Sequence, residues 1–191
     1  MNHLFWVDIE TTGLNETIDI LLEVALVVTD REANVIDWSG GILDHAPGFV
    51  AGLMPDRVLQ MHTESGLLTD LEESGMSLEE TEQKLVEFVD RYTDADHGHK
   101  PVLCGSSVHF DRKFLHVYMP KLMERFHYRN LDVSSIREAL RNAGATELID
   151  RGGEPAHRAL DDILATIDEF KRYRQVLQSG LAAVGEVGPS A

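Results

Sequence analysis

The chain has 191 residues, 43% of them hydrophobic, and a formal net charge of −16 at pH 7. This length fits one globular domain, and the hydrophobic fraction excludes wholesale disorder. The excess of acidic over basic residues argues against a broad basic surface that would bind long nucleic acids. No apolar run approaches the roughly 20 residues that a membrane-spanning helix needs, so we expect no membrane association.

Two features of the sequence bear on the cellular compartment. The first residues lack the basic flank and the small-residue cleavage site of a secretory signal peptide. Cys104 is the single cysteine, which excludes an internal disulfide and is typical of a reducing compartment. We therefore expect a cytoplasmic protein.

The N-terminal quarter of the chain has the pattern of three β-strands. Leu4–Val7 is a continuous apolar run, as expected of a strand that is buried on both faces. Residues 20–29 are rich in Leu and Val, and residues 34–43 alternate more loosely around Trp38. The short connections between these segments predict an antiparallel three-stranded start to a sheet.

The remainder of the chain is dominated by helical patterns. Residues 48–75 show no clean period, so we expect a loop with short helical pieces. Ser77-Leu-Glu-Glu80 is a capping-box pattern and predicts the start of an amphipathic helix. A short buried strand is predicted at residues 101–104. Helical patterns follow at about residues 111–123, 134–142 and 156–177.

These elements predict the fold class. Three strands followed by alternating strands and helices are typical of a mixed α/β sheet with helices against its faces. No linker, repeat or low-complexity segment divides the chain, so we expect one domain over residues 1–178. Residues 179–191 are small and polar, which predicts a flexible C-terminal tail.

Two acidic residues stand where the first apolar strand ends. Residues two apart in a strand point to the same face, so Asp8 and Glu10 would project together. Carboxylates held this close repel each other unless a proton or a cation compensates. Oxygen ligands of this kind suit Mg²⁺ or Mn²⁺, so the pair is a candidate metal site.

Two further groups can carry chemistry, although each is also common as ordinary structure. Asp111 follows Gly105-Ser-Ser107 at the start of a predicted helix, where an acid also interacts favourably with the helix dipole. His157 begins another helical pattern and is followed by Asp161 and Asp162. Spacing alone leaves open which of these two acids would share a site with the histidine.

The chain resembles the DEDDh 3′→5′ exonucleases in the order of these motifs. The Asp-x-Glu pair comes first, the mid-chain Asp follows, and the histidine with its acid comes last. Several segments are also similar to the oligoribonucleases within that class, and these are Asp8–Leu14, Leu22–Ala25, His62–Leu67, Tyr118–Pro120 and Phe126–Ser134. The resemblance covers nearly the whole chain. It implies a ribonuclease-H-like fold, with a mixed β-sheet flanked by α-helices. It also implies hydrolysis of short single-stranded RNA, from a dinucleotide to a few nucleotides, to nucleoside 5′-monophosphates.

The resemblance assigns roles to individual residues. It implies that His157 is the general base, and it favours Asp162 over Asp161 as a metal ligand. The acids that it implies as ligands are Asp8, Glu10, Asp111 and Asp162. They would hold two divalent cations, Mg²⁺ or Mn²⁺, about 3.5 to 4 Å apart, which activate a water and stabilise the leaving oxygen.

The resemblance also implies six substrate-binding residues. Leu14 would wedge near the bases. Four residues would approach the 5′-phosphate end of the substrate, and these are His62, Ser107, Arg129 and Ser134. Tyr128 would come from a second subunit, which implies a homodimer.

The chain departs from the oligoribonuclease pattern at three positions. Arg57 stands where relatives carry Trp, and its guanidinium group could stack on a base or bind phosphate. Phe110 stands where oligoribonucleases have Gln and is closer to the pattern of DNA proofreading exonucleases. His109 has no obvious counterpart. These differences weaken an inference of strict dinucleotide preference.

Two alternatives remain open at this stage. The first is a DEDDh exonuclease that acts on single-stranded DNA or on longer RNA. The second is a catalytically inactive nucleic-acid-binding module on the same fold. The intact set of four acids and one histidine argues against the second alternative, because lost activity usually leaves a missing ligand.

Overall fold

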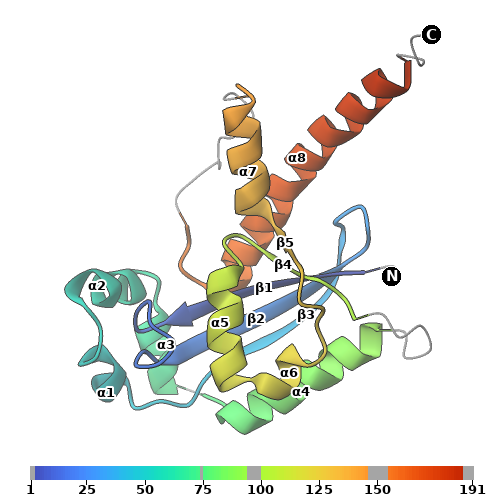
Figure 1. Ribbon diagram of the computed structural model, residues 1–191. Coiled ribbons are helices and arrows are strands. Elements are labelled where there is room, and N and C mark those ends of the chain that lie inside the picture. The colour runs from blue at the N-terminus through green and yellow to red at the C-terminus, as the bar shows by residue number, and fades with distance from the viewer. Residues whose placement is uncertain (1–2, 74, 94–99, 146–154, 187–191) are drawn as a thin grey trace.

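A mixed β-sheet organises the chain, whose computed structural model describes residues 3–73, 75–93, 100–145 and 155–186. Its strands lie in the order β3-β2-β1-β4-β5 (Figure 1). They are β1 Leu4–Thr11, β2 Leu21–Thr29, β3 Val35–Ile42, β4 Leu103–Gly105 and β5 Asn130–Asp132. The first three pair antiparallel, whereas β4 pairs parallel with both β1 and β5. The predicted antiparallel start and the predicted mixed sheet are both confirmed.

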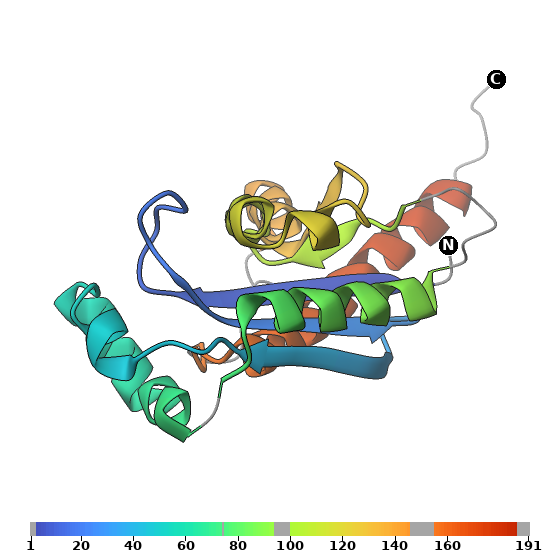
Figure 2. The same cartoon turned by 90° about the horizontal axis from the view of Figure 1, so that it is seen from below.

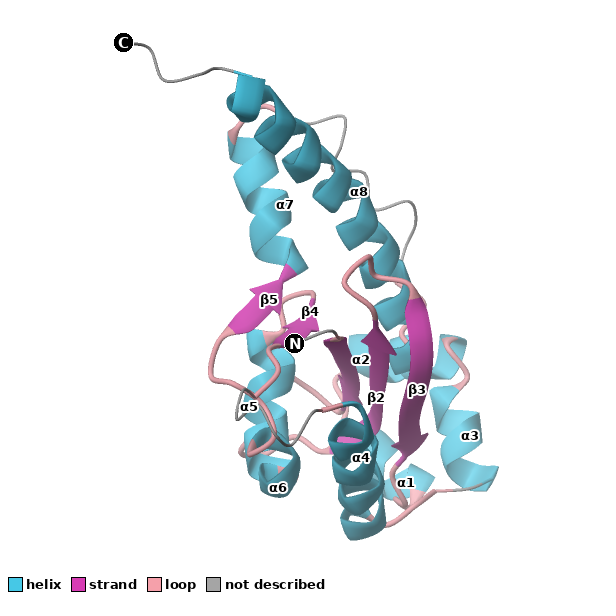
Figure 3. Ribbon diagram, turned by 90° about the vertical axis from the view of Figure 1, so that its right-hand side faces the viewer, coloured by secondary structure: helices cyan, strands magenta, loops and turns pink. Residues whose placement is uncertain are grey.

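The central strand β1 contributes to a hydrophobic core on each face of the sheet. Because side chains alternate along a strand, Phe5 and Val7 enter one core and Trp6 enters the other. The first core is covered by α4 Leu78–Tyr92, α5 His109–Tyr118 and α6 Pro120–Met123. The second is covered by α7 Val133–Asn142 and α8 Ala159–Glu186, which lie side by side (Figure 3). Both faces of β1 are therefore buried, as its unbroken apolar run predicts.

Residues 48–75 contain three short helices, which are α1 Pro47–Ala51, α2 Asp56–Glu64 and α3 Leu67–Glu73. They form a group at one end of the sheet, apart from the other helices (Figure 2). Val50, Leu67 and Leu71 bury a small core of their own against Leu22 of β2. The longest of the three helices has nine residues, which is too short to show a clear helical period.

Elsewhere two elements differ from the prediction and one local signal is confirmed. The helix predicted at residues 111–123 is divided, because Met119 has a non-helical backbone (φ −134°, ψ 61°) and Pro120 starts α6. Strand β5 was not predicted, since three residues are too few to show an alternating pattern. The capping box is confirmed, with the Ser77 side chain accepting from the Glu80 backbone N–H.

The last helix corrects the predicted C-terminal boundary. It was expected to end near residue 177, but α8 continues to Glu186, so residues 179–186 are helical. The rest of the predicted tail, residues 187–191, lies outside the described part of the chain. Within the residues that the structure describes, no helix is both long and apolar enough to cross a membrane.

A buried ion pair joins α7 to α8. Arg137 donates from Nε and Nη2 to the two carboxylate oxygens of Glu169, at 2.5 and 2.7 Å. The Tyr173 hydroxyl donates to the same carboxylate at 2.5 Å. Arg137 and Glu169 are both buried. Such a pair adds little net stability over apolar residues, but removal of one partner leaves a buried charge without compensation.

We expect Arg137→Ala to lower the free energy of unfolding by about 3 to 5 kcal/mol, because Glu169 would stay buried without its guanidinium partner. Arg141→Ala is the matched control on the same helix. Arg141 pairs with Glu138 in an exposed i,i+3 bridge, so its loss should cost less than about 1 kcal/mol. Urea denaturation followed by circular dichroism measures both, and equal losses would contradict the prediction.

Candidate active site

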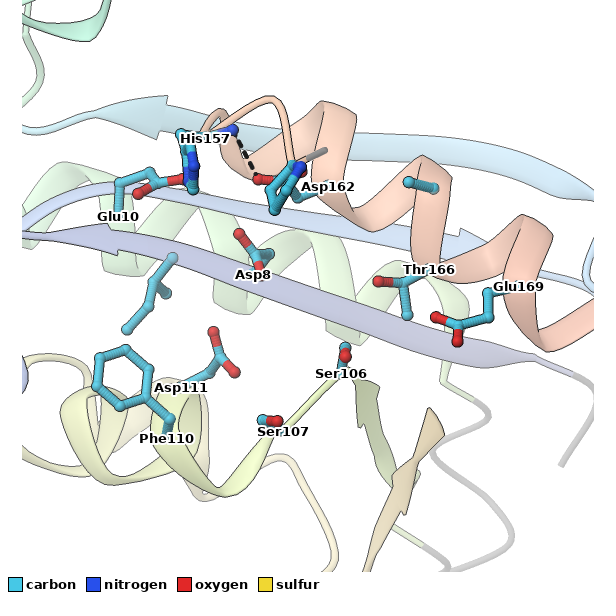
Figure 4. A pocket seen from close by; sticks show the side chains of 13 residues that line it. Asp8, Glu10, Ser106, Ser107, Phe110, Asp111, His157, Asp162, Thr166 and Glu169 are labelled. Atoms are coloured by element: carbon cyan, nitrogen blue, oxygen red, sulfur yellow. Dashed lines mark hydrogen bonds between the residues drawn. The ribbon is translucent and has the colours of Figure 1, made fainter. Parts of the chain in front are cut away.

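One pocket collects all five residues that the sequence singles out for catalysis. It lies where β1, α5 and the start of α8 meet (Figure 4). Among the residues that line it are Asp8, Glu10, Asp111, His157 and Asp162. These residues come from three segments that are far apart in the sequence, and the sheet topology brings them together.

Strand β1 delivers two of the acids. Asp8 and Glu10 stand opposite Ala25 and Glu23 in the regular register with β2, so their side chains share one face. A register irregularity follows directly, between Glu10 and Thr11. Glu10 is buried, with 6% of its surface exposed. The predicted common projection of the two carboxyl groups is confirmed.

The turn between β4 and α5 places the third acid. A Cβ at Gly105 would lie 3.0 Å from the Val7 carbonyl oxygen, so the chain approaches β1 closely here. Ser107 has a positive φ of 56°, and its backbone N–H donates to Asp132 Oδ1 at 2.9 Å. The turn brings Asp111, in the first turn of α5, into the pocket, where it is 4% exposed.

The loop before α8 places the general-base candidate and the fourth acid. His157 has a positive φ of 55°. The Asp162 carboxylate accepts the backbone N–H groups of Ala156 and His157, each at 2.9 Å, and so fixes this loop. Asp161 is exposed and lies on the far side of the helix start, beside Glu23 and outside this pocket. Of the two acids that spacing alone left open, Asp162 is the one that lines the pocket with His157.

The loop is held from its other side by an arginine. Arg158 donates to both carboxylate oxygens of Glu23, at 3.2 and 3.3 Å, and lies 2.7 Å from Asp70 Oδ2 on α3. The Ala159 backbone N–H also donates to Glu23, at 3.1 Å. Because these contacts join segments that are distant in the sequence, no local pattern predicts them.

Burial and neighbouring acids raise the pKa values of three carboxyl groups in the pocket. Burial is the largest cause, and it raises the pKa of Asp8 well above its usual range with help from Asp111 and Glu10. Burial followed by Asp162 raises the pKa of Glu10 to about 8, and burial raises that of Asp111 to about 7. Protons or cations are needed to compensate such a set.

The donor set fits divalent cations. One ligand atom each from Glu10, His157 and Asp162 lies within 4.8 Å of the others, and Figure 4 shows the Asp8 carboxyl between this group and Asp111. The four carboxyl groups that line the pocket offer hard-oxygen ligands of the kind that Mg²⁺ and Mn²⁺ prefer, and the His157 imidazole lies beside them.

The structure brings only some of the predicted substrate-binding residues together. Ser107 lines the pocket, and its hydroxyl lies 3.4 Å from that of Ser134. Leu14 and Tyr128 do not line it, and their side chains are 77% and 74% exposed. Arg129, also exposed, stacks its guanidinium 5.2 Å from the Tyr128 ring centroid.

His62 is buried rather than open to a substrate. Its Nε2 donates to the Thr11 carbonyl oxygen at 2.9 Å, and its Nδ1 lies 3.9 Å from Glu10 Oε2. Within the described part of the chain, Nδ1 has no hydrogen-bond partner. Burial lowers the pKa of this imidazole. His62 thus lies next to Glu10 in the protein interior and does not line the pocket.

Other pocket residues were missed or left without a role by the sequence analysis. Thr166 and Glu169 continue along α8 beyond Asp162 (Figure 4). Their spacing of four and seven residues from Asp162 puts them on the same helix face, which is a signal that could have found them. Ser106 and Phe110 also line the pocket.

Comparisons with known proteins agree with this geometry. A family model described as exonuclease matches residues 5–170. The chain is 39% identical to an oligoribonuclease of Neisseria meningitidis serogroup B over 177 residues, which are 91% of each protein. It is 42% identical to a probable oligoribonuclease of Dictyostelium discoideum, over 90% of this chain and 88% of that protein.

Solved structures share the fold. Exonuclease I from Methylocaldum szegediense aligns with a TM-score of 0.64 at 19% identity, over 92% of this chain and 41% of its own. The metal-free complex of E. coli exonuclease I with single-stranded DNA gives a TM-score of 0.59 at 17% identity. The chain thus spans less than half of these larger proteins, and the likeness establishes the ribonuclease-H-like fold. Since the exonuclease model and the relatives both cover most of the sequence, the chain belongs to the oligoribonuclease family of DEDDh exonucleases.

Proposed function

We propose that this chain is a 3′→5′ exoribonuclease that hydrolyses short single-stranded oligoribonucleotides to nucleoside 5′-monophosphates. The observation that carries the proposal is the pocket that four acids and one histidine line together. Its place in a chain similar to oligoribonucleases over 91% of its length supports the choice of substrate. A net charge of −16 is also compatible with a short substrate, which carries few phosphates to be repelled.

The proposed cofactors are two divalent cations, Mg²⁺ or Mn²⁺, with Asp8, Glu10, Asp111 and Asp162 as ligands. When bound, such ions lower the pKa of a water and stabilise charge on the leaving 3′-oxygen. His157 is the proposed general base, because an imidazole can take the proton from that water near neutral pH. Asp162 also positions the base, since its carboxylate accepts the His157 backbone N–H.

Six residues are proposed to contact the substrate, and these are Leu14, His62, Ser107, Tyr128, Arg129 and Ser134. The adjacent hydroxyl groups of Ser107 and Ser134 support a site for the 5′-phosphate. The exposed ring of Tyr128 supports a contact across a homodimer interface. For His62 the proposal rests on the resemblance alone, because its ring is buried and would have to move. A cytoplasmic location likewise stays a prediction.

We expect His157→Ala to lower kcat on a diribonucleotide by about 10² to 10⁴-fold, the usual contribution of a general base. Asp8→Ala should also abolish activity, because it removes a ligand from the centre of the acid group. Asp161→Ala is the matched control and should keep wild-type kcat, since Asp161 lies outside the pocket. Circular dichroism checks folding, and full activity in either folded site variant would refute the assignment.

The raised pKa values predict how stability depends on pH. The Glu10 and Asp111 carboxyl groups, with pKa values of about 8 and about 7, hold protons in the folded protein. In the unfolded chain they lose them near pH 4. Between about pH 4 and pH 8 the folded state therefore binds more protons than the unfolded state. The contribution of these two groups to the free energy of unfolding of the metal-free protein should be complete below about pH 4 and should be lost as pH rises to about 8.

Thermal unfolding in EDTA between pH 5 and 8.5 measures this dependence. Added Mn²⁺ should raise the melting temperature most at the alkaline end, because the ion binds the ionised carboxylates. Asp161→Asn, which leaves the pocket intact, should show the wild-type slope. A flat profile in EDTA would contradict the predicted pH dependence, and no effect of Mn²⁺ would favour the inactive binding module.

Substrate length separates the proposal from its main alternative, an exonuclease acting on single-stranded DNA or longer RNA. That alternative has one observation in its favour, since the Phe110 ring lines the pocket where the oligoribonuclease pattern has Gln. We expect kcat/KM with Mn²⁺ to be higher for a diribonucleotide than for twenty-nucleotide RNA or DNA. Preference for either long substrate would end the oligoribonuclease proposal.

A further inference from the structure

Helix α5 holds the loop between β1 and β2, residues 12–20. Lys113 Nζ donates to the Leu14 carbonyl oxygen at 2.7 Å and lies 2.9 Å from Glu16 Oε2. The Tyr118 hydroxyl donates to the Asp19 carbonyl oxygen at 2.6 Å. The loop is therefore fastened to one helix at two points, one near each end.

The loop is also braced internally. The Asp19 carboxylate accepts the Asn15 backbone N–H at 2.8 Å and the Thr12 hydroxyl at 3.3 Å. A Cβ at Gly13 would lie 2.5 Å from Asp19 Oδ1, so any larger residue here would displace this carboxylate from its place in the loop. Because these bonds hold the loop together, we expect residues 12–20 to move as one piece. The hydrogen bonds from Lys113 and Tyr118 then set the position of the loop relative to α5.

The same helix forms part of the pocket. Its first turn contributes Phe110 and Asp111 to the lining. Lys113 Nζ lies 5.0 Å from the Phe110 ring centroid, a cation–π distance. Lys113 thus joins the pocket wall to a loop that exposes two large aliphatic side chains, Leu14 and Ile18, at 77% and 74%. An apolar surface beside a nucleotide site can pack against the face of a base.

We infer that Lys113 is a positioning residue, which fixes the Leu14 loop beside the pocket and thereby sets the affinity for the terminal nucleobase. The inference rests on the proposed function. The ammonium group is already engaged by the Leu14 carbonyl, Glu16 and the Phe110 ring, so it acts through the loop and not as a phosphate ligand. Its loss should therefore weaken substrate binding and leave the chemical step nearly unchanged.

The test compares lysine variants in steady-state hydrolysis of a diribonucleotide. Lys113→Met, which keeps the aliphatic stem, should raise KM by about 10-fold, as expected for loss of a charged hydrogen bond, with kcat within about 3-fold of wild type. Lys113→Arg keeps a donor and should restore KM. Glu16→Gln should raise KM by less than about 3-fold, because the bond to the Leu14 carbonyl remains. Lys121→Met on α6 is the control for lost charge and should leave KM unchanged.

Hydrogen–deuterium exchange on the full chain supplies a second readout. Residues 12–20 should exchange faster in Lys113→Met than in wild type, while α5 stays protected. Tyr118→Phe removes the other hydrogen bond to the loop and should likewise raise KM and speed exchange of residues 12–20. This variant tests the inference if Lys113→Met does not fold. The inference would be overturned if KM rose equally in Lys121→Met. It would also be overturned if Lys113→Met lost kcat at constant KM, or if exchange of residues 12–20 were unchanged in that variant. If the wild-type protein does not cleave short RNA, the proposed function fails. Hydrogen–deuterium exchange would then still test whether Lys113 holds residues 12–20.

Discussion

Mutual repulsion among four largely buried carboxyl groups is the constraint around which this molecule is arranged. The four groups are brought from three different stretches of chain and then held against their neighbours. Strand β1 holds two by register, the Gly105 turn holds Asp111, and backbone N–H donors hold Asp162. The repulsion is tolerated in the folded chain because each acid is fixed by local structure whose stability comes from the two cores on either side of the sheet.

Cationic side chains of the structure stabilise the surroundings of the site more than its centre. Arg158 joins the loop that carries His157 to β2 and α3, and Arg137 pairs with Glu169 at the far end of the pocket. Arg158 lowers the pKa of Glu10, but burial and the neighbouring acids outweigh it. The centre of the pocket therefore keeps a strong demand for positive charge, and this demand is the physical basis for selecting metal ions.

The sequence predicts those parts of the fold and site that depend on local order. The buried run of β1 and the capping box at Ser77 are local signals, and both are confirmed. The pairing of β5, the burial of His62 behind Glu10 and the Arg158 bridge depend on contacts between distant segments. Asp162 was chosen over Asp161 only by resemblance, because the direction of a first helical turn is not encoded by spacing.

The left-handed backbone at His157 restricts what evolution can place there. Glycine adopts this conformation freely, and Asn, Asp and His adopt it more readily than other residues with a side chain. β-Branched residues adopt it only at an appreciable cost in free energy. Substitution of His157 by asparagine, aspartate or glycine is therefore expected to preserve the loop better than substitution by other residues. Under the proposed role of His157 as general base, such a substitution would remove the base and leave the loop in place.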